Sequence, residues 1–237
     1  MDEVRLIEIA EDIHADNELV ARELRIRLGD EKVFLVNLMS APGSGKTRTI
    51  LRTIAELQKD LRCGVIEADI DSKVDAEAIA AEGISAVQLN TGGFCHLDAT
   101  MVAQGLDQLE LADLDVVIIE NVGNLVCPAE FDTGAMLKVM ILSVPEGDDK
   151  PLKYPLMFSL CDVLLVNKID YLEFDLSDFD MAKLRERVRK LNPEIEIFEI
   201  SAKTGEGVGE WADWLSREAK RFLGPAEMLA RERRGYL

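Results

Sequence analysis

The sequence predicts an α/β fold, namely a P-loop NTPase with a mostly parallel sheet flanked by helices on both faces. The first observation is an apolar run at residues 33–39 that leads directly into Ser-Ala-Pro-Gly-Ser-Gly-Lys-Thr at residues 40–47, as a strand leads into a phosphate-binding loop. The second is that apolar segments of strand length alternate with segments of helical periodicity, which is typical of parallel sheets. The third is that polar motifs follow the strands, at the end where parallel sheets bind ligands.

The phosphate-binding loop consists of small residues, which let backbone N–H groups point at phosphate oxygens. We expect Lys46 to reach the β- and γ-phosphates and the Thr47 hydroxyl to ligate Mg²⁺. The pattern usually begins with Gly, and Ser40 stands in that place here. The alternative is an ordinary β-to-α turn of small residues with a surface lysine, but Gly43, Gly45, Lys46 and Thr47 are all intact between a strand and a helix, which favours the phosphate-binding loop. The loop residues expected to bind nucleotide are Gly43, Ser44, Gly45, Lys46, Thr47 and Arg48.

Length and composition limit the class of protein. A chain of 237 residues, 48% of them hydrophobic, suits one sizeable domain or two small ones. The net charge of −18 argues against a protein that binds nucleic acid or an anionic membrane. No apolar run is long enough to span a membrane, and the N-terminus lacks the features of a signal peptide. With only four cysteines a disulfide framework is not expected, so we expect a cytoplasmic protein.

The remaining pattern predicts strands and helices in alternation. Apolar residues recur at helical spacing over 4–28 with a polar break at Asp16-Asn17, which predicts two helices or one bent helix. Residues 145–155 are expected to form a loop, and Ser177 is expected to cap the helix at 177–191. The predicted strands are 33–39, 63–67, 86–89, 115–120, 137–144, 162–167 and 195–200, and the other predicted helices are 46–59, 74–82, 97–109 and 207–223.

A base-binding motif, Asn167-Lys168-Ile169-Asp170, follows one of these strands. The Asp170 carboxylate can accept hydrogen bonds from guanine N1 and N2. Adenine has an acceptor at N1 and would leave the carboxylate unpaired, at a cost of about 1–3 kcal/mol. Asn167 is expected either to meet the O6/N7 edge of guanine or to brace the phosphate loop, and Lys168 is expected to stack over the base. Taken alone, the motif also fits a solvated turn.

A second base-binding loop is predicted at Ser201, Ala202 and Lys203, at the end of another strand. The backbone N–H of Ala202 can donate to guanine O6. The phosphate loop, the Asn-Lys-x-Asp motif and this loop occur in that order along the chain. Together they predict a protein that binds GTP and GDP.

Hydrolysis of GTP needs carboxylates and Mg²⁺ near the γ-phosphate. Glu120 ends a strand that should lie beside the phosphate loop, and the N–H of Gly123 can then reach the γ-phosphate. We expect Asp69 and Glu120 to hold Mg²⁺ or its waters together with Thr47.

The predicted catalytic residues are Lys46, Asp75 and Glu120. Asp75 is expected to lie near the attacking water, although an Asp at this place is equally suited to cap a helix. Asp69 and Asp71 are alternatives for positioning the water. No Gln follows Gly123, so slow intrinsic turnover is expected.

A second site is predicted at Cys95, His96 and Cys127, which follow strands on the same side of the sheet. Two thiolates and an imidazole suit Zn²⁺, Ni²⁺ or Cu⁺. The alternative is that these are unrelated loop residues, because they form no compact Cys-x-x-Cys pair. Cys63 and Cys161 begin apolar strands and are expected to be buried and inert.

With these motifs in place, the chain from about residue 30 to residue 222 resembles the HypB family of SIMIBI-class P-loop GTPases, which insert nickel during [NiFe]-hydrogenase maturation. The two cysteine-bearing strings are highly specific to that family. The strings that carry the resemblance are residues 40–47, Glu67–Asp71, Val87–Gly92, Cys95–Asp98, Glu120–Pro128 and Asn167–Asp170.

The resemblance implies a GTP-hydrolysing metallochaperone. Its metal site at Cys95, His96 and Cys127 would lie at an interface that forms when GTP promotes homodimerisation. It also implies partnership with a second nickel-binding maturation protein and with the hydrogenase large subunit precursor. Some members carry an N-terminal Cys-x-x-Cys-Gly-Cys motif or a histidine-rich stretch, whereas the N-terminal region here has only His14. The interface site is therefore the expected site for Zn²⁺ or Ni²⁺.

The predicted organisation is an N-terminal helical segment at 1–30, a P-loop GTPase domain with the metal site at 31–223, and a C-terminal tail at 224–237. Three other functions are alternatives: a related metal-delivery GTPase for urease or a cobalamin enzyme, a GTP-dependent switch with a structural Zn²⁺ site, and a small-molecule kinase. The cysteine-bearing strings argue against the first of these, and the guanine motifs argue against the kinase.

Overall fold

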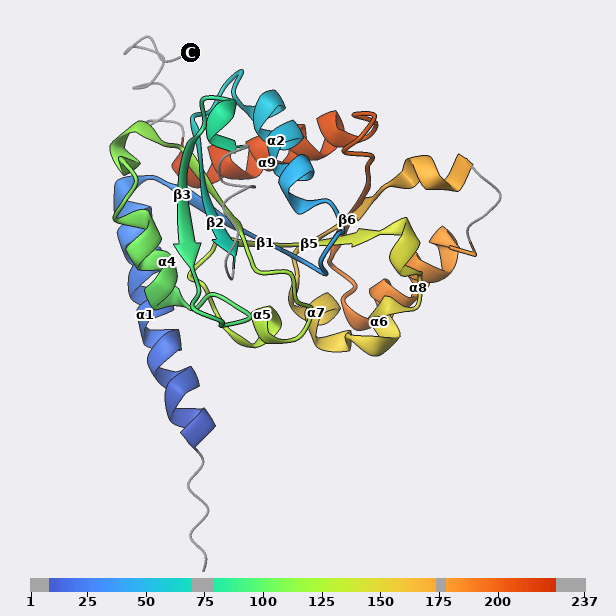
Figure 1. Cartoon of the computed structure of the whole chain (residues 1–237), viewed down its shortest axis with the longest axis horizontal. Coiled ribbons are helices and arrows are strands. Elements are labelled where there is room, and N and C mark those ends of the chain that lie inside the picture. The colour runs from blue at the N-terminus through green and yellow to red at the C-terminus, as the bar shows by residue number, and fades with distance from the viewer. Residues whose placement is uncertain (1–8, 70–78, 174–177, 225–237) are drawn as a thin grey trace, which may run out of the picture.

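The computed structural model describes residues 9–69, 79–173 and 178–224 of the chain. Its centre is a seven-stranded sheet in the order β3-β2-β4-β1-β5-β6-β7, in which every neighbouring pair is parallel (Figure 1). The α/β class is confirmed, with an entirely parallel sheet where the sequence predicts a mostly parallel one. The strands are β1 (Phe34–Ser40), β2 (Cys63–Asp69), β3 (Ser85–Asn90), β4 (Val116–Glu120), β5 (Leu137–Ser143), β6 (Val163–Asn167) and β7 (Glu196–Glu199).

Helices cover both faces of this sheet, because each parallel pair of strands needs a crossover connection. Most of the helix predicted over 74–82 lies outside the described residues. In its described part, residues 79–81 are helical. The longer helices are α1 (Ile9–Glu31), α2 (Lys46–Leu57), α4 (Ala99–Leu106), α8 (Met181–Leu191) and α9 (Val208–Leu223), and the short ones are α5 (Cys127–Glu130), α6 (Lys150–Lys153), α7 (Pro155–Leu160), η1 (Leu111–Asp113), η2 (Val144–Glu146) and η3 (Ile169–Glu173).

The central strands are buried on both faces, and their alternate side chains enter different parts of the core. Val36 of β1 packs in the same cluster as Ile54 of α2 and Leu215 of α9. Leu35, its neighbour along the strand, packs with Leu28 of α1 on the opposite face. Figure 1 shows α2 and α9 on one face and α1, α4, α7 and α8 on the other. The continuous apolar runs in the sequence follow from this two-sided burial.

Of the two alternatives for the N-terminal segment, a pair of separate helices is wrong, because α1 is one helix over Ile9–Glu31 with no interruption at Asp16-Asn17. The reason is that the Asn17 side chain makes its hydrogen bonds to distant backbone groups, at Asp132 and Ala99. It therefore does not compete for the backbone of its own helix, as an Asn often does. Within the described residues, no helix is both long and apolar enough to cross a membrane.

Two further boundaries were predicted wrongly. Residues 145–155 are not a single loop, because α6 begins at Lys150 and ends where α7 follows. Helix α8 begins at Met181, and its cap is Asp180, whose carboxylate accepts from the Lys183 N–H at 3.0 Å. Ser177, the predicted cap, lies outside the described residues, and the cap of α8 is Asp180, three positions later.

Gly207 provides a test of how β7 is joined to α9. It precedes α9 with φ of 70°, and a Cβ built there would lie 2.0 Å from the carbonyl oxygen of Glu199. We expect Gly207→Ala to lower the free energy of unfolding by about 2–4 kcal/mol, because strain and a backbone clash act together. Gly209 is the matched control: it lies in α9 with open space around it, so Gly209→Ala should stabilise by about 0.5–1 kcal/mol. Urea unfolding of both variants measures this, and equal stabilities would contradict the assignment.

Candidate nucleotide and metal site

The phosphate loop joins β1 to α2 and needs glycine at two places. Gly43 has φ of 75° and Gly45 has φ of 97°, a left-handed conformation that side chains disfavour. A Cβ at Gly45 would lie 2.7 Å from Nδ2 of Asn167. The glycines therefore let the loop take its shape and let the base-binding motif approach it closely.

Ser40, which replaces the usual first glycine, has a definite place in this loop. Its side chain is fully buried, and its Oγ accepts from Lys46 Nζ at 3.1 Å and from Ser44 Oγ at 2.6 Å. The serine that replaces glycine thus supplies a hydroxyl that contacts Lys46, the lysine expected to bind phosphate. Nothing in the motif predicted this role.

A candidate Mg²⁺ position lies where the phosphate loop meets the end of β4. The Thr47 hydroxyl donates to Glu120 Oε1 at 2.8 Å, and Glu120 is buried beside Leu38 of β1, its register partner. A hydroxyl and a carboxylate are the hard oxygen donors that Mg²⁺ prefers, so these two residues fit that ion. Asp69 ends β2 at the same edge of the sheet, and the description covers its backbone only.

Two predicted acidic residues, Asp71 and Asp75, lie outside the described residues. Their expected contact with the attacking water therefore stays a prediction.

Asn167 braces the loops that surround the nucleotide pocket. Its Nδ2 donates to the carbonyl of Ser44 at 2.8 Å, and its Oδ1 accepts from the Ala202 N–H at 3.0 Å. Of the two roles expected for Asn167, the bracing contact is the one in the structure. Lys168 has a left-handed φ of 63° and donates through Nζ to the carbonyl of Gly43 at 2.7 Å.

Asp170 lies in a cavity of about 200 Å³ between the phosphate loop and the two base-binding loops. It is 9% exposed, and its Oδ1 accepts from the Ser201 hydroxyl at 2.7 Å. Lys203 Nζ lies 3.8 Å from its Oδ2. The cavity is lined by Gly43, Gly45, Arg48, Asn167, Lys168, Asp170, Tyr171, Ala202 and Lys203, which brings most of the predicted nucleotide residues together.

The segment from Glu120 to Cys127, which we call the linking segment, packs against the phosphate loop. Asn121 donates to Asn37 Oδ1 at 3.1 Å, and both side chains are buried. A Cβ at Gly123 would lie 3.0 Å from the Pro42 ring. The linking segment therefore starts in contact with the phosphate loop, and Cys127 at its end begins α5, which the sequence did not predict as a helix.

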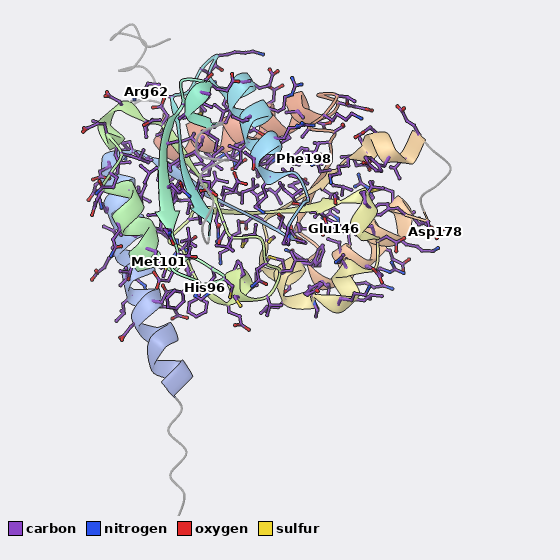
Figure 2. All side chains as sticks on the ribbon, viewed as in Figure 1. Arg62, His96, Met101, Glu146, Asp178 and Phe198 are labelled. Atoms are coloured by element: carbon purple, nitrogen blue, oxygen red, sulfur yellow. The ribbon has the colours of Figure 1, made fainter. Side chains whose placement is uncertain are left out.

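The structure brings Cys95, His96 and Cys127 together. The two sulfurs are 3.0 Å apart, and the Cys95 sulfur is 3.9 Å from Nδ1 of His96. One ligand atom from each residue lies within 4.8 Å of the other two, and no other group of this kind occurs in the described part of the chain. The reading as unrelated loop residues is therefore wrong. Figure 2 shows His96 at the opposite end of the sheet from Arg62, which precedes β2, and so at the carboxyl edge.

Neighbouring side chains hold these three residues in place. The His96 ring stacks on Phe131, with centroids 3.9 Å apart and 19° between the planes. Asn124 donates to the Cys95 carbonyl at 3.4 Å and accepts from the Val126 N–H at 2.9 Å. Sequence reasoning missed both Asn124 and Phe131, because their role comes from contacts between segments distant in the chain.

The four cysteines fall into two classes. The hydrogen bond with Cys95, together with desolvation, raises the pKa of the Cys127 thiol. Burial raises the pKa of Cys63 to about 12 and that of Cys161 to about 12. The last two are protonated at neutral pH and enclosed in the core, as predicted. Only the paired cysteines are accessible to a metal ion.

Comparison with known proteins agrees with this geometry. Residues 34–199 match the family described as CobW/HypB/UreG, nucleotide-binding domain. The chain is 48% identical over 214 residues to hydrogenase maturation factor HypB of Azotobacter chroococcum mcd 1, an alignment that covers 90% of this chain and 70% of that protein.

Two solved structures are also similar. HypB from Helicobacter pylori in complex with nickel superposes with a TM-score of 0.81 at 37% identity, covering 89% of this chain and 98% of that one. HypB from Archaeoglobus fulgidus superposes with a TM-score of 0.80 at 38% identity, covering 87% of this chain and 100% of that one.

Proposed function

Because this chain belongs to the HypB family of hydrogenase maturation factors, we propose that it is a GTP-hydrolysing metallochaperone that helps insert nickel during [NiFe]-hydrogenase maturation. The observation that carries the proposal is the linking segment, which begins beside Thr47 of the phosphate loop and ends at the Cys95, His96 and Cys127 cluster. One stretch of backbone can therefore respond both to the γ-phosphate and to a metal ion.

The phosphate loop would hold GTP through its backbone N–H groups and Lys46. Thr47, Glu120 and Asp69 would hold Mg²⁺, which when bound neutralises charge that develops on the phosphates. The N–H of Gly123, a residue that lies beside Pro42 of the phosphate loop, would approach the γ-phosphate. Asp75 would orient the attacking water. Slow turnover to GDP and phosphate follows from the absence of a Gln after Gly123.

The base pocket would select guanine through Asp170, whose carboxylate accepts from N1 and N2 of the base. Support comes from the Ser201 hydroxyl, which bonds to Oδ1 and fixes the orientation of the carboxylate. Lys168 reaches across the phosphate loop to Gly43, so its aliphatic chain can cover one face of the base. Ala202 and Lys203 would close the far side of the pocket.

Nickel would be cargo at Cys95, His96 and Cys127, since two sulfurs and an imidazole suit Ni²⁺ and also Zn²⁺. We propose that GTP promotes a homodimer with this cluster at its interface. The nickel would pass between a second nickel-binding maturation protein and the hydrogenase large subunit precursor. The setting would be the cytoplasm, where thiols stay reduced.

Guanine selectivity can be tested with Asp170→Asn. An amide cannot accept from both guanine donors, but it can donate to the carbonyl oxygen that xanthine carries at C2. We expect GTP binding to weaken by about tenfold to a hundredfold, as expected for one unpaired polar group, and binding of xanthosine triphosphate to strengthen. Calorimetric titration with both nucleotides measures this. An unchanged preference for GTP would contradict the role of Asp170.

Metal delivery can be tested by titrating Ni²⁺ into the wild type and Cys127→Ala, with GDP and with a non-hydrolysable GTP analogue. We expect the wild type to bind Ni²⁺ and to double its mass with the GTP analogue. Cys127→Ala should lose most of its nickel affinity, because one of the soft ligands is removed, while its affinity for GDP is retained.

The matched control is Cys161→Ala, a cysteine buried away from the cluster, which should bind nickel like the wild type. Nickel affinity that is insensitive both to nucleotide and to Cys127→Ala would contradict the delivery function. A bound Zn²⁺ that stays in place through GTP hydrolysis would instead support a GTP-dependent switch with a structural metal.

A further inference from the structure

Asn17, on the inner side of α1, bonds to both segments that carry the metal-ligating residues. It is 8% exposed. Its Oδ1 accepts from the Ala99 N–H at 2.9 Å, and its Nδ2 donates to the carbonyl of Asp132 at 2.9 Å. Ala99 begins α4, just after Cys95 and His96, whereas Asp132 follows α5, which Cys127 begins. A single carboxamide therefore connects the two segments from a third element.

The Asp132 end of this connection is fixed by a second residue of α1. Arg25 Nη2 donates to both carboxylate oxygens of Asp132, at 2.6 and 2.8 Å, and to the carbonyl of Ala135 at 3.2 Å. The same carboxylate accepts from the Gly134 N–H at 3.0 Å. The turn after α5 is thus held against α1 by both its backbone and its side chain.

Close packing at Gly134 keeps α1 and this turn in contact. Gly134 has φ of 77°, and a Cβ there would lie 2.8 Å from a methyl carbon of Leu24. Leu24 is itself 4% exposed. The turn therefore packs closely on α1, at a position where the left-handed φ and the Leu24 side chain both favour glycine.

The connection reaches His96 through Phe131 on one side and fixes the start of α4 on the other. Asp132 follows Phe131, whose ring stacks on His96 with centroids 3.9 Å apart. Ala99 follows Asp98, which caps α4 by accepting from the Met101 N–H at 2.8 Å and so fixes the start of that helix. A shift of Asn17 would move the His96 segment relative to Cys127.

We propose that Asn17 is a positioning residue for the metal cluster, which it holds together by tying the Cys95 and His96 segment to the Cys127 segment. This inference rests on the proposed function, because it concerns a site for nickel. The inference gives α1 a defined role, because this helix holds the two segments that carry the metal ligands next to each other. An Asn in the middle of a helix is a weak helix former, so its tertiary hydrogen bonds explain its presence better than helix formation does.

The test uses the full chain with Asn17→Leu, Asn17→Asp and the control Glu18→Gln, an exposed neighbour on the same helix. Leu is close to Asn in size but makes neither hydrogen bond. Asp keeps the acceptor for the Ala99 N–H and loses the donor to Asp132. Nickel affinity is measured by competition with a chromophoric chelator, the ligand arrangement by the thiolate-to-nickel charge-transfer band, and GDP affinity by calorimetry.

We expect Asn17→Leu to bind Ni²⁺ about tenfold more weakly, equivalent to about 1.4 kcal/mol, with a shifted charge-transfer band. Asn17→Asp should also bind Ni²⁺ more weakly, because it keeps the acceptor for the Ala99 N–H but turns an oxygen that cannot donate toward the Asp132 carbonyl. Glu18→Gln should match the wild type, and all three variants should bind GDP as the wild type does. Wild-type nickel affinity and an unshifted band in Asn17→Leu would overturn the proposal.

A metal-free measurement separates this proposal from the proposed function. Diamide oxidises two adjacent thiols to a disulfide and is itself reduced to the hydrazine, taking up both protons and both electrons. The rate of Cys95–Cys127 disulfide formation then reports how well the sulfurs are held together. It should fall several-fold in Asn17→Leu, and an equal rate would overturn the positioning role.

Failure of the wild type to bind nickel would contradict the proposed function, while the diamide rates would still decide the role of Asn17. Should Asn17→Leu fail to fold, Asn17→Asp carries both measurements. Its charge-transfer band and its diamide rate should then differ from those of Glu18→Gln, and identity between these two variants would overturn the proposal.

Discussion

The packing of the linking segment on the phosphate loop is the constraint on which the rest of the site depends. Thr47 bonds to Glu120 at one end of the contact, and Gly123 lies against Pro42 further along. Glu120 is buried, and a Cβ at Gly123 would lie 3.0 Å from the Pro42 ring. In the proposed function, a change at the γ-phosphate is transmitted along this backbone toward Cys127.

Strand order explains why these groups meet at all. Because β1 and β4 are neighbours in a parallel sheet, the phosphate loop and Glu120 leave the same edge side by side. The segment after β3 reaches that edge as well and brings Cys95 and His96 to Cys127. The base-binding loops follow β6 and β7 on the other side of β1. The cavity beside Asp170 and the Cys95, His96 and Cys127 cluster thus lie on either side of the phosphate loop, and Asn17 of α1 bonds to the two segments that carry the cluster.

The features that were predicted correctly from the sequence are those that depend on local sequence patterns. Continuous apolar runs identified the strands, the spacing of the phosphate loop identified the ligand class, and the cysteine-bearing strings identified the family. Sequence analysis failed where a residue's role depends on contacts with distant parts of the chain. Asn17 was interpreted as a helix break, because its hydrogen bonds to Ala99 and Asp132 cannot be predicted from the local sequence. Ser40 was read only as a departure from a pattern, although its hydroxyl contacts Lys46. The three residues Cys95, His96 and Cys127 could be identified from the sequence, but the short distances between their ligand atoms depend on the fold.

The central claim is that occupation of one pocket changes the other, and reciprocal calorimetry tests it most directly. The affinity for a non-hydrolysable GTP analogue is measured with and without saturating Ni²⁺, and the affinity for Ni²⁺ with and without the analogue. The account predicts that the two ratios agree, as linkage requires, and that both differ from one by about fivefold or more. A ratio of one in both titrations, with each ligand bound tightly by itself, would contradict it.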